Sequence, residues 1–158
     1  MLLRELLDKL EYECTQGSSE REVSGIVYDS RKVEKGCLFI CIKGANFDGH
    51  AFADEVVRQG AGVLVVSDPV KVPAKTDVTV IRVADTRYAM AFISAAWFGH
   101  PARKLKTIGI TGTKGKTTST YLVKSILENA GYKVGLIGTN GNWIGDEMLH
   151  TEHTTPES

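Results

Sequence analysis

A glycine-rich segment occupies residues 109–118, with the sequence Gly-Ile-Thr-Gly-Thr-Lys-Gly-Lys-Thr-Thr. An apolar, β-prone stretch leads into the segment and a helical pattern follows it, which predicts a loop between a strand and a helix. Glycine lets the backbone turn tightly and approach a ligand closely. Because the N-terminus of a helix also attracts anions, this arrangement is typical of phosphate binding.

We therefore expect the loop to bind ATP together with Mg²⁺. Lys116 is predicted to reach the β- and γ-phosphates and to act as the catalytic residue, since its charge would stabilise a transferring phosphoryl group. The Thr117 hydroxyl is the predicted Mg²⁺ ligand. The pattern departs from the usual G-x-x-x-x-G-K-[ST] spacing, with Ile110 where glycine is expected. The predicted nucleotide-binding residues are Gly112, Thr113, Lys114, Gly115, Lys116, Thr117 and Thr118.

Strand patterns and helix patterns alternate along the chain, which predicts an α/β fold with largely parallel sheets. The expected strands are residues 23–28, 37–42, 62–67, 78–83, 107–111 and 134–139. The expected helices are residues 2–10, about 50–60, 85–98 and 116–130. Asp85 is a candidate helix N-cap. Gly60 and Gly131 lie at expected helix C-termini, where a residue in the left-handed conformation commonly caps the helix.

A chain of 158 residues can hold one large domain or two small ones. We expect residues 1–103 to form a mixed α/β domain and residues 104–158 to begin a parallel-sheet domain that contains the loop. In the second domain, strands 107–111 and 134–139 are expected to be adjacent and parallel, with a right-handed crossover. Because two strands make only a marginal sheet, this domain is interpreted as truncated and the chain as the front of a longer protein.

Composition excludes several classes of protein. Lys and Arg number 19, as do Asp and Glu, and this balance argues against nucleic-acid binding. The apolar runs are far shorter than the roughly 18 residues of a membrane span, and the N-terminus does not resemble a secretory signal. The three cysteines form no C-x-x-C pair and are interpreted as reduced thiols. These features predict a cytoplasmic protein.

Three motifs, in the right order, resemble the Mur ligase family. The loop has the form G-x-x-G-T-x-G-K-T-T of these ligases and of their folylpolyglutamate-synthase relatives. Residues 28–33, 36–39 and 44–52 look like the domain that holds the UDP part of a muramyl precursor. Residues 154–157, Thr-Thr-Pro-Glu, resemble a substrate-contacting segment of the member that adds the third amino acid. The resemblance covers almost the whole chain, about the first third of such an enzyme.

The resemblance implies an ATP-dependent amide ligase of peptidoglycan-precursor synthesis. It would add diaminopimelate or L-lysine to UDP-N-acetylmuramoyl-L-Ala-D-Glu through an acyl phosphate, as a monomer. Residues 1–103 would be the precursor-binding domain, and the family's remaining active-site residues would lie beyond Ser158, so this chain alone should bind and not catalyse. The implied substrate-binding residues are Tyr28, Ser30, Ala45, Asn46, Phe47, His153, Thr154 and Thr155.

Other interpretations stay open at this stage. The sister ligase that adds D-Ala-D-Ala has a similar front domain and loop, and a nucleotide-binding module without ligase activity would also fit. The loop itself could be a glycine-rich turn with a coincidental Lys-Thr pair. Ser30 could simply close a turn. His50 is interpreted as a capping or solvent-exposed side chain rather than a catalytic one.

Overall fold

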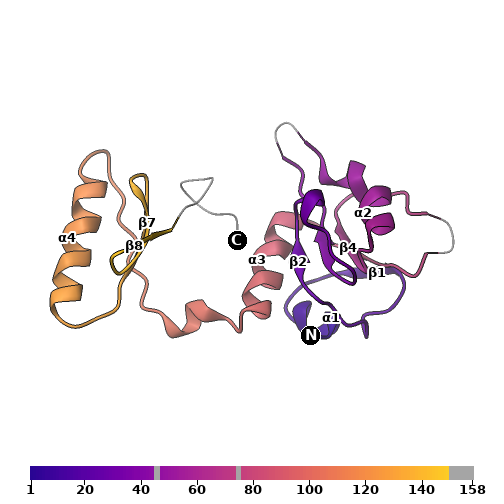
Figure 1. Ribbon diagram of the computed structural model, residues 1–158, viewed down its shortest axis with the longest axis horizontal. Coiled ribbons are helices and arrows are strands. Elements are labelled where there is room, and N and C mark those ends of the chain that lie inside the picture. Colours follow the sequence, from indigo (N-terminus) through magenta and orange to yellow (C-terminus); the bar gives the residue numbers. More distant parts are fainter. Residues whose placement is uncertain (45–46, 74–75, 150–158) are drawn as a thin grey trace. The chain divides into compact units, whose positions relative to one another are not determined.

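The computed structural model describes residues 1–44, 47–73 and 76–149. The chain divides into two compact units, Met1–Lys104 and Leu105–Ser158 (Figure 1). Among the described residues, no helix combines the length and the apolar character that crossing a bilayer requires.

The first unit is built on a five-stranded sheet with the order β1-β5-β4-β3-β2. Strands β2 to β5 are mutually parallel, and β1 pairs antiparallel with β5. The four parallel strands fall inside the segments predicted from the sequence, which confirms that part of the prediction. The sequence reasoning missed β1, since all of its residues are exposed and it carries no apolar alternation. The bounds are β1 Glu13–Gln16, β2 Ile26–Val27, β3 Leu38–Ile40, β4 Val63–Val66 and β5 Thr79–Arg82.

Three α-helices accompany this sheet: α1 (Leu3–Leu6), α2 (Ala53–Gln59) and α3 (Thr86–Trp97). The predicted caps are confirmed. The Asp85 carboxylate accepts hydrogen bonds from two N–H groups in the first turn of α3, and α2 ends at Gly60 with φ of 118°. The prediction for residues 2–10 was too long, because the helix covers only four of them. Its leucines are buried against α3 instead of along a continued helix.

The core of the first unit lies on both faces of the sheet because successive strand residues point to opposite sides. In β4, Val63 and Val65 pack with residues of α1 and α3, whereas Leu64 and Val66 pack with residues of α2. All four of these side chains are buried. Coverage of both faces is the usual condition of a parallel sheet.

The second unit contains α4 (Lys116–Asn129) and an antiparallel sheet of β6 (Gly135–Gly138), β7 (Gly141–Ile144) and β8 (Glu147–Leu149). Two-residue turns connect β6 to β7 and β7 to β8, which suits antiparallel neighbours. The helix at 116–130 and the strand at 134–139 are thereby confirmed.

Two expectations for this unit are wrong. Residues 107–111 are described and are not a strand, and β6 pairs antiparallel with β7 instead of parallel with that segment. A β-strand needs a ladder partner, and none of the described residues supplies one for residues 107–111. The turn signals Asn140-Gly141 and Gly145-Asp146 were present in the sequence, but no hairpin was predicted from them.

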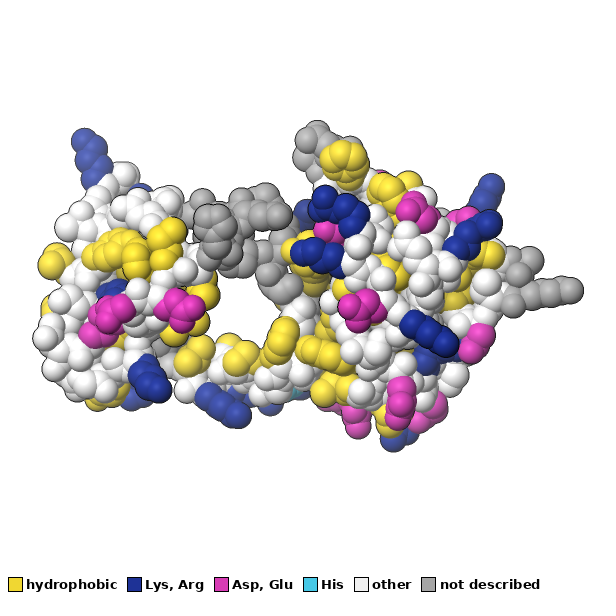
Figure 2. Space-filling model, in the orientation of Figure 1, with side chains coloured by type: hydrophobic (Ala, Val, Ile, Leu, Met, Phe, Trp, Pro, Cys, Tyr) yellow, Lys and Arg dark blue, Asp and Glu magenta, His cyan; other side chains and the backbone are white. Residues whose placement is uncertain are grey.

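Apolar side chains lie at the surface of the second unit (Figure 2). Within the described part of this unit, α4 has no buried residue. Ile108, Leu122, Ile126 and Ile137 each expose at least 60% of their surface. The described residues therefore leave Leu122 and Ile126 of this helix mostly exposed.

Candidate functional site

The glycine-rich loop leads directly into α4. Gly115 is the N-cap of the helix and has φ of 77°, in the left-handed region that glycine adopts without strain. A Cβ at this position would meet no heavy atom within 4 Å, so the backbone conformation, and not lack of space, favours glycine here. Ser119 donates the first intrahelical backbone bond, to the Gly115 carbonyl at 2.9 Å. The N–H groups that precede Ser119 in the helix have no intrahelical acceptor and are available to an anion.

Lys116 lies at the start of α4 and folds back over the loop. Its Nζ donates a hydrogen bond to the Gly112 carbonyl oxygen at 2.6 Å. A lysine ammonium has three N–H donors, and this bond occupies one of them. The first turn of α4 is wholly described and contains no acidic residue, so the charge there is positive. This arrangement suits phosphate oxygens.

The predicted metal ligand, Thr117, lies beside a residue that the sequence reasoning did not connect with the loop. Thr117 Oγ1 and Thr139 Oγ1 are 3.5 Å apart, which places the residue after β6 next to the first turn of α4. Hydroxyl oxygens belong to the hard oxygen donors that Mg²⁺ accepts. The position of Thr139 at the end of the strand that follows the helix could have indicated this contact.

Three of the substrate residues expected in the first unit lie at the carboxyl edge of its sheet. Because β2 and β3 are parallel neighbours, the segments that follow them meet at one edge. Tyr28 and Ser30 follow β2, and Phe47 lies in the loop after β3. Tyr28 is 54% exposed and Phe47 is 76% exposed. The remaining expected substrate residues lie outside the described residues: Ala45, Asn46, His153, Thr154 and Thr155.

The turn after β2 is closed by Asp29. Its carboxylate accepts the Arg31 backbone N–H at 3.0 Å and two bonds from the Arg31 guanidinium, from Nε at 2.9 Å and from Nη2 at 2.7 Å. The hydrogen bonds from Arg31 lower the pKa of Asp29 from 3.8 to about 2. Asp29, and not Ser30, is therefore the residue whose side chain closes this turn.

The loop after β3 returns as a hairpin whose stem comprises residues 42–44 and 47–49. Gly44 N donates to the Phe47 carbonyl at 2.8 Å, and Gly49 N donates to the Ile42 carbonyl at 2.9 Å. A Cβ on Gly49 would lie 2.7 Å from the Ile42 nitrogen, so this position has no space for a side chain. The stem is thus fixed by close backbone contact.

The structure corrects the interpretation of His50 as a cap or an exposed side chain. Its side chain is only 7% exposed, and both ring nitrogens have partners. Nδ1 lies 2.6 Å from Asp48 Oδ1, and Nε2 accepts the backbone N–H groups of Ser67 at 3.0 Å and Asp68 at 3.3 Å. Hydrogen bonds from the His50 backbone and ring lower the pKa of Asp48. The Asp-Gly-His spacing after the loop could have indicated the contact with Asp48, but not the contacts with Ser67 and Asp68.

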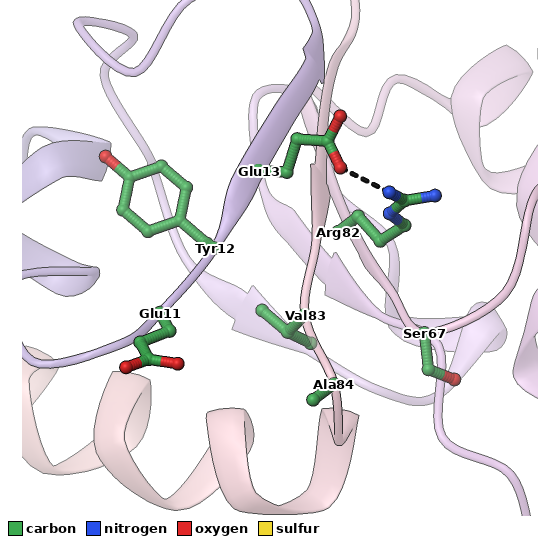
Figure 3. Close-up of a pocket in the computed structure, with 7 residues that line it drawn as sticks. All are labelled: Glu11, Tyr12, Glu13, Ser67, Arg82, Val83 and Ala84. Carbon is green, nitrogen blue, oxygen red and sulfur yellow. Dashed lines mark hydrogen bonds and ion pairs between the residues drawn. The ribbon is translucent and has the colours of Figure 1, made fainter.

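A separate open depression of about 470 Å³ lies at the ends of β4 and β5 (Figure 3). An ion pair between Glu13 and Arg82 spans one side of it. None of the expected site residues contributes to its wall. The lining residues are Glu11, Tyr12, Glu13, Ser67, Arg82, Val83 and Ala84.

Comparison with known families places two domain models along the chain in succession. The Mur ligase family catalytic domain matches residues 22–98, and the Mur ligase middle domain matches residues 110–158. The first match covers most of the unit with the parallel sheet. The middle-domain match begins at Ile110 and therefore includes residues 110–118 of the glycine-rich loop.

Two similar proteins are UDP-N-acetylmuramoyl-L-alanyl-D-glutamate–2,6-diaminopimelate ligases of clostridia. The protein of Clostridium perfringens is 49% identical over 158 residues, and ligase 1 of Clostridium acetobutylicum is 50% identical over 159 residues. Each alignment covers 100% of this chain and 32% of the relative. The chain therefore spans about a third of the length of the curated relatives it matches.

Two solved structures show the same fold. A UDP-N-acetylmuramoyl-L-alanyl-D-glutamate–2,6-diaminopimelate ligase matches 99% of this chain and 31% of its own, with a TM-score of 0.71 at 24% identity. MurF of Acinetobacter baumannii is 32% identical and matches 80% of this chain and 27% of its own, with a TM-score of 0.56. With two successive domain matches and relatives of this similarity along its full length, the chain belongs to the Mur ligase family.

Proposed function

We propose that this chain forms the precursor-binding and phosphate-binding parts of a ligase that adds diaminopimelate to UDP-N-acetylmuramoyl-L-alanyl-D-glutamate. The observation that carries the proposal is the 49% identity, over the whole chain, to a ligase of that name. The geometry of the loop supports it, since Gly115 and Lys116 stand where a phosphate-binding loop needs a glycine and a cation. Residues 1–103 are assigned to the precursor and residues 104–158 to ATP.

The chemistry is ATP-driven amide formation. A precursor carboxylate attacks the γ-phosphorus of ATP, and ADP leaves, which gives an acyl phosphate. The amine of the amino acid then attacks the acyl carbon, phosphate leaves, and the amine loses a proton. Lys116 and the first N–H groups of α4 would hold the phosphate oxygens and offset their growing charge. The Thr117 hydroxyl would help to hold Mg²⁺, which would supply positive charge to the phosphates.

The UDP end of the precursor is assigned to the carboxyl edge of the first sheet. Tyr28 offers an exposed aromatic ring there, and Ser30 offers a hydroxyl that the Asp29 turn does not require. Phe47, on the neighbouring hairpin, could cover an aromatic base. The neighbouring Ala45 and Asn46 are assigned to the same end. His153, Thr154 and Thr155 are assigned to the muramoyl-peptide portion.

One alternative has an observation in its favour. The similarity to MurF of Acinetobacter baumannii fits a ligase that acts one step later and adds D-alanyl-D-alanine. That similarity covers 80% of the chain at 32% identity, whereas the diaminopimelate ligases cover all of it at 49% to 50%. The diaminopimelate reaction is therefore the better candidate.

Thermal unfolding in the presence of candidate substrates tests the proposal. A ligand that binds only the folded state raises the melting temperature, and the rise increases with its affinity and concentration. We expect UDP-N-acetylmuramoyl-L-Ala-D-Glu to raise it more than the tripeptide precursor does, and UDP-glucose to leave it unchanged. A larger shift with the tripeptide precursor would favour the D-alanyl-D-alanine reaction, and equal shifts with UDP-glucose would contradict both.

A further inference from the structure

The strongest unassigned feature is the buried imidazole of His50, which connects two loops at the carboxyl edge of the first sheet. One loop is the hairpin stem, residues 42–44 and 47–49, which follows β3. The other begins at Ser67, directly after β4. Both ring nitrogens of His50 are used in this connection.

The donors around the ring determine its tautomer. Backbone N–H groups can only donate, so the bonds from Ser67 and Asp68 require Nε2 to be an acceptor. The ring proton then lies on Nδ1 and is donated to the Asp48 carboxylate at 2.6 Å. His50 must be neutral in this arrangement, since a proton on Nε2 would face two other donors.

The Asp48 carboxylate also caps the N-terminus of the short 3₁₀ helix Gly49–Phe52. Asp48 Oδ1 accepts the His50 backbone N–H at 3.0 Å as well as the ring Nδ1–H. Asp48 is paired with Lys43 across the stem. His50 therefore joins the stem to the segment after β4, together with an exposed ion pair between Lys43 and Asp68 at 3.8 Å.

We propose that His50 is a positioning residue for precursor binding, holding the hairpin stem against the end of β4 so that Phe47 faces the UDP end of the substrate. The inference rests on the proposed function. His50 would not contact the substrate itself, and its contribution would lie in keeping the stem fixed before the ligand arrives.

Two substitutions separate the two sides of the ring. In His50→Asn the amide nitrogen can replace Nδ1 as a donor to Asp48, but the side chain is too short to reach Ser67. In His50→Gln the amide oxygen can replace Nε2 as the acceptor for Ser67 and Asp68. We expect His50→Asn to weaken binding of UDP-N-acetylmuramoyl-L-Ala-D-Glu about five- to tenfold, and His50→Gln to stay within about twofold of wild type.

The experiment is calorimetric titration of the protein with this precursor and, separately, with Mg-ATP. Ile93→Val, in α3 on the opposite face of the sheet, is the control for loss of stability alone. We expect Ile93→Val to have a melting temperature similar to that of His50→Asn but to bind the precursor with wild-type affinity. The affinity for Mg-ATP should be unchanged in every variant. Ring ¹⁵N chemical shifts should show the proton on Nδ1 in the wild type.

The outcomes separate this inference from the proposed function. Wild-type affinity in His50→Asn, or equal weakening in Ile93→Val, would overturn the positioning role and leave the proposed function standing. A ring proton on Nε2 would also overturn it. A wild-type protein that does not bind the precursor would overturn the proposed function, and the inference with it.

Discussion

The two units of this chain differ in how far each one buries its own apolar residues. In the first unit, helices cover both faces of the parallel sheet, and Leu64 at its centre is fully buried. In the second unit, α4 has no buried residue in the described structure, and Leu122 is 60% exposed. The edge proposed to bind the precursor is thus built on a closed core, whereas the loop proposed to bind phosphate depends on local backbone geometry.

The sharpest test of this comparison is the same substitution made in both units. We expect Leu64→Ala to lower the free energy of unfolding by about 2–5 kcal/mol, because it leaves a cavity in a closed core. Leu122→Ala should change it by less than about 0.5 kcal/mol, because the side chain is already mostly in water. Urea denaturation followed by circular dichroism measures both. Equal losses would mean that the second unit buries this leucine in solution.

A second pair of substitutions compares glycines. A Cβ on Gly49 would lie 2.7 Å from the Ile42 nitrogen and 3.0 Å from the Cys41 Cα, and backbone atoms cannot easily move away. We expect Gly49→Ala to cost about 1–3 kcal/mol of stability. A Cβ on Gly109 would meet no atom within 4 Å, so Gly109→Ala should be nearly neutral. A neutral Gly49→Ala would show that the stem can shift away from β3.

The same contrast explains what could be predicted from the sequence. The parallel strands of the first unit were predictable because runs such as Val63–Val66 are apolar throughout, as strands buried on both faces must be. Asp85 and Gly60 were predictable because cap chemistry is local. The loop preceding α4 was recognisable for the same reason.

Three of the failures share one cause, which is dependence on residues distant in the sequence. A strand at residues 107–111 requires a ladder partner, and none of the described residues provides one. Strand β1 is exposed, so its pairing with β5 left no periodic pattern. The role of His50 depends on Ser67 and Asp68, 17 and 18 residues away, and spacing alone could not reveal it.

A substitution at Ser30 tests whether the precursor and the nucleotide bind at separate sites. We expect Ser30→Ala to weaken precursor binding several-fold, about the value of one neutral hydrogen bond, and to leave Mg-ATP affinity unchanged. Calorimetric titration with each ligand measures this. An equal loss for both ligands would contradict the assignment of the two ligands to different units.

The smallest expected effect is the acid dependence of the Asp29 turn. The pKa of Asp29 is held at about 2 in the folded protein, below its ordinary value of 3.8. Its contribution to stability is therefore present above about pH 4 and is lost as the pH falls through about 2. Carboxyl ¹³C titration by NMR should give this low midpoint, and Arg31→Ala should move it upward. An unchanged midpoint in Arg31→Ala would exclude Arg31 as the cause.

We propose that the loop before α4 binds the phosphates of ATP through Lys116. Calorimetric titration of the protein with Mg-ATP tests it most directly, with Lys133→Ala as the control, since Lys133 is an exposed lysine outside the loop. We expect Lys116→Ala to weaken binding about 10- to 100-fold, as the loss of a charge-assisted contact predicts, and Lys133→Ala to match wild type. Wild-type affinity in Lys116→Ala would contradict the claim.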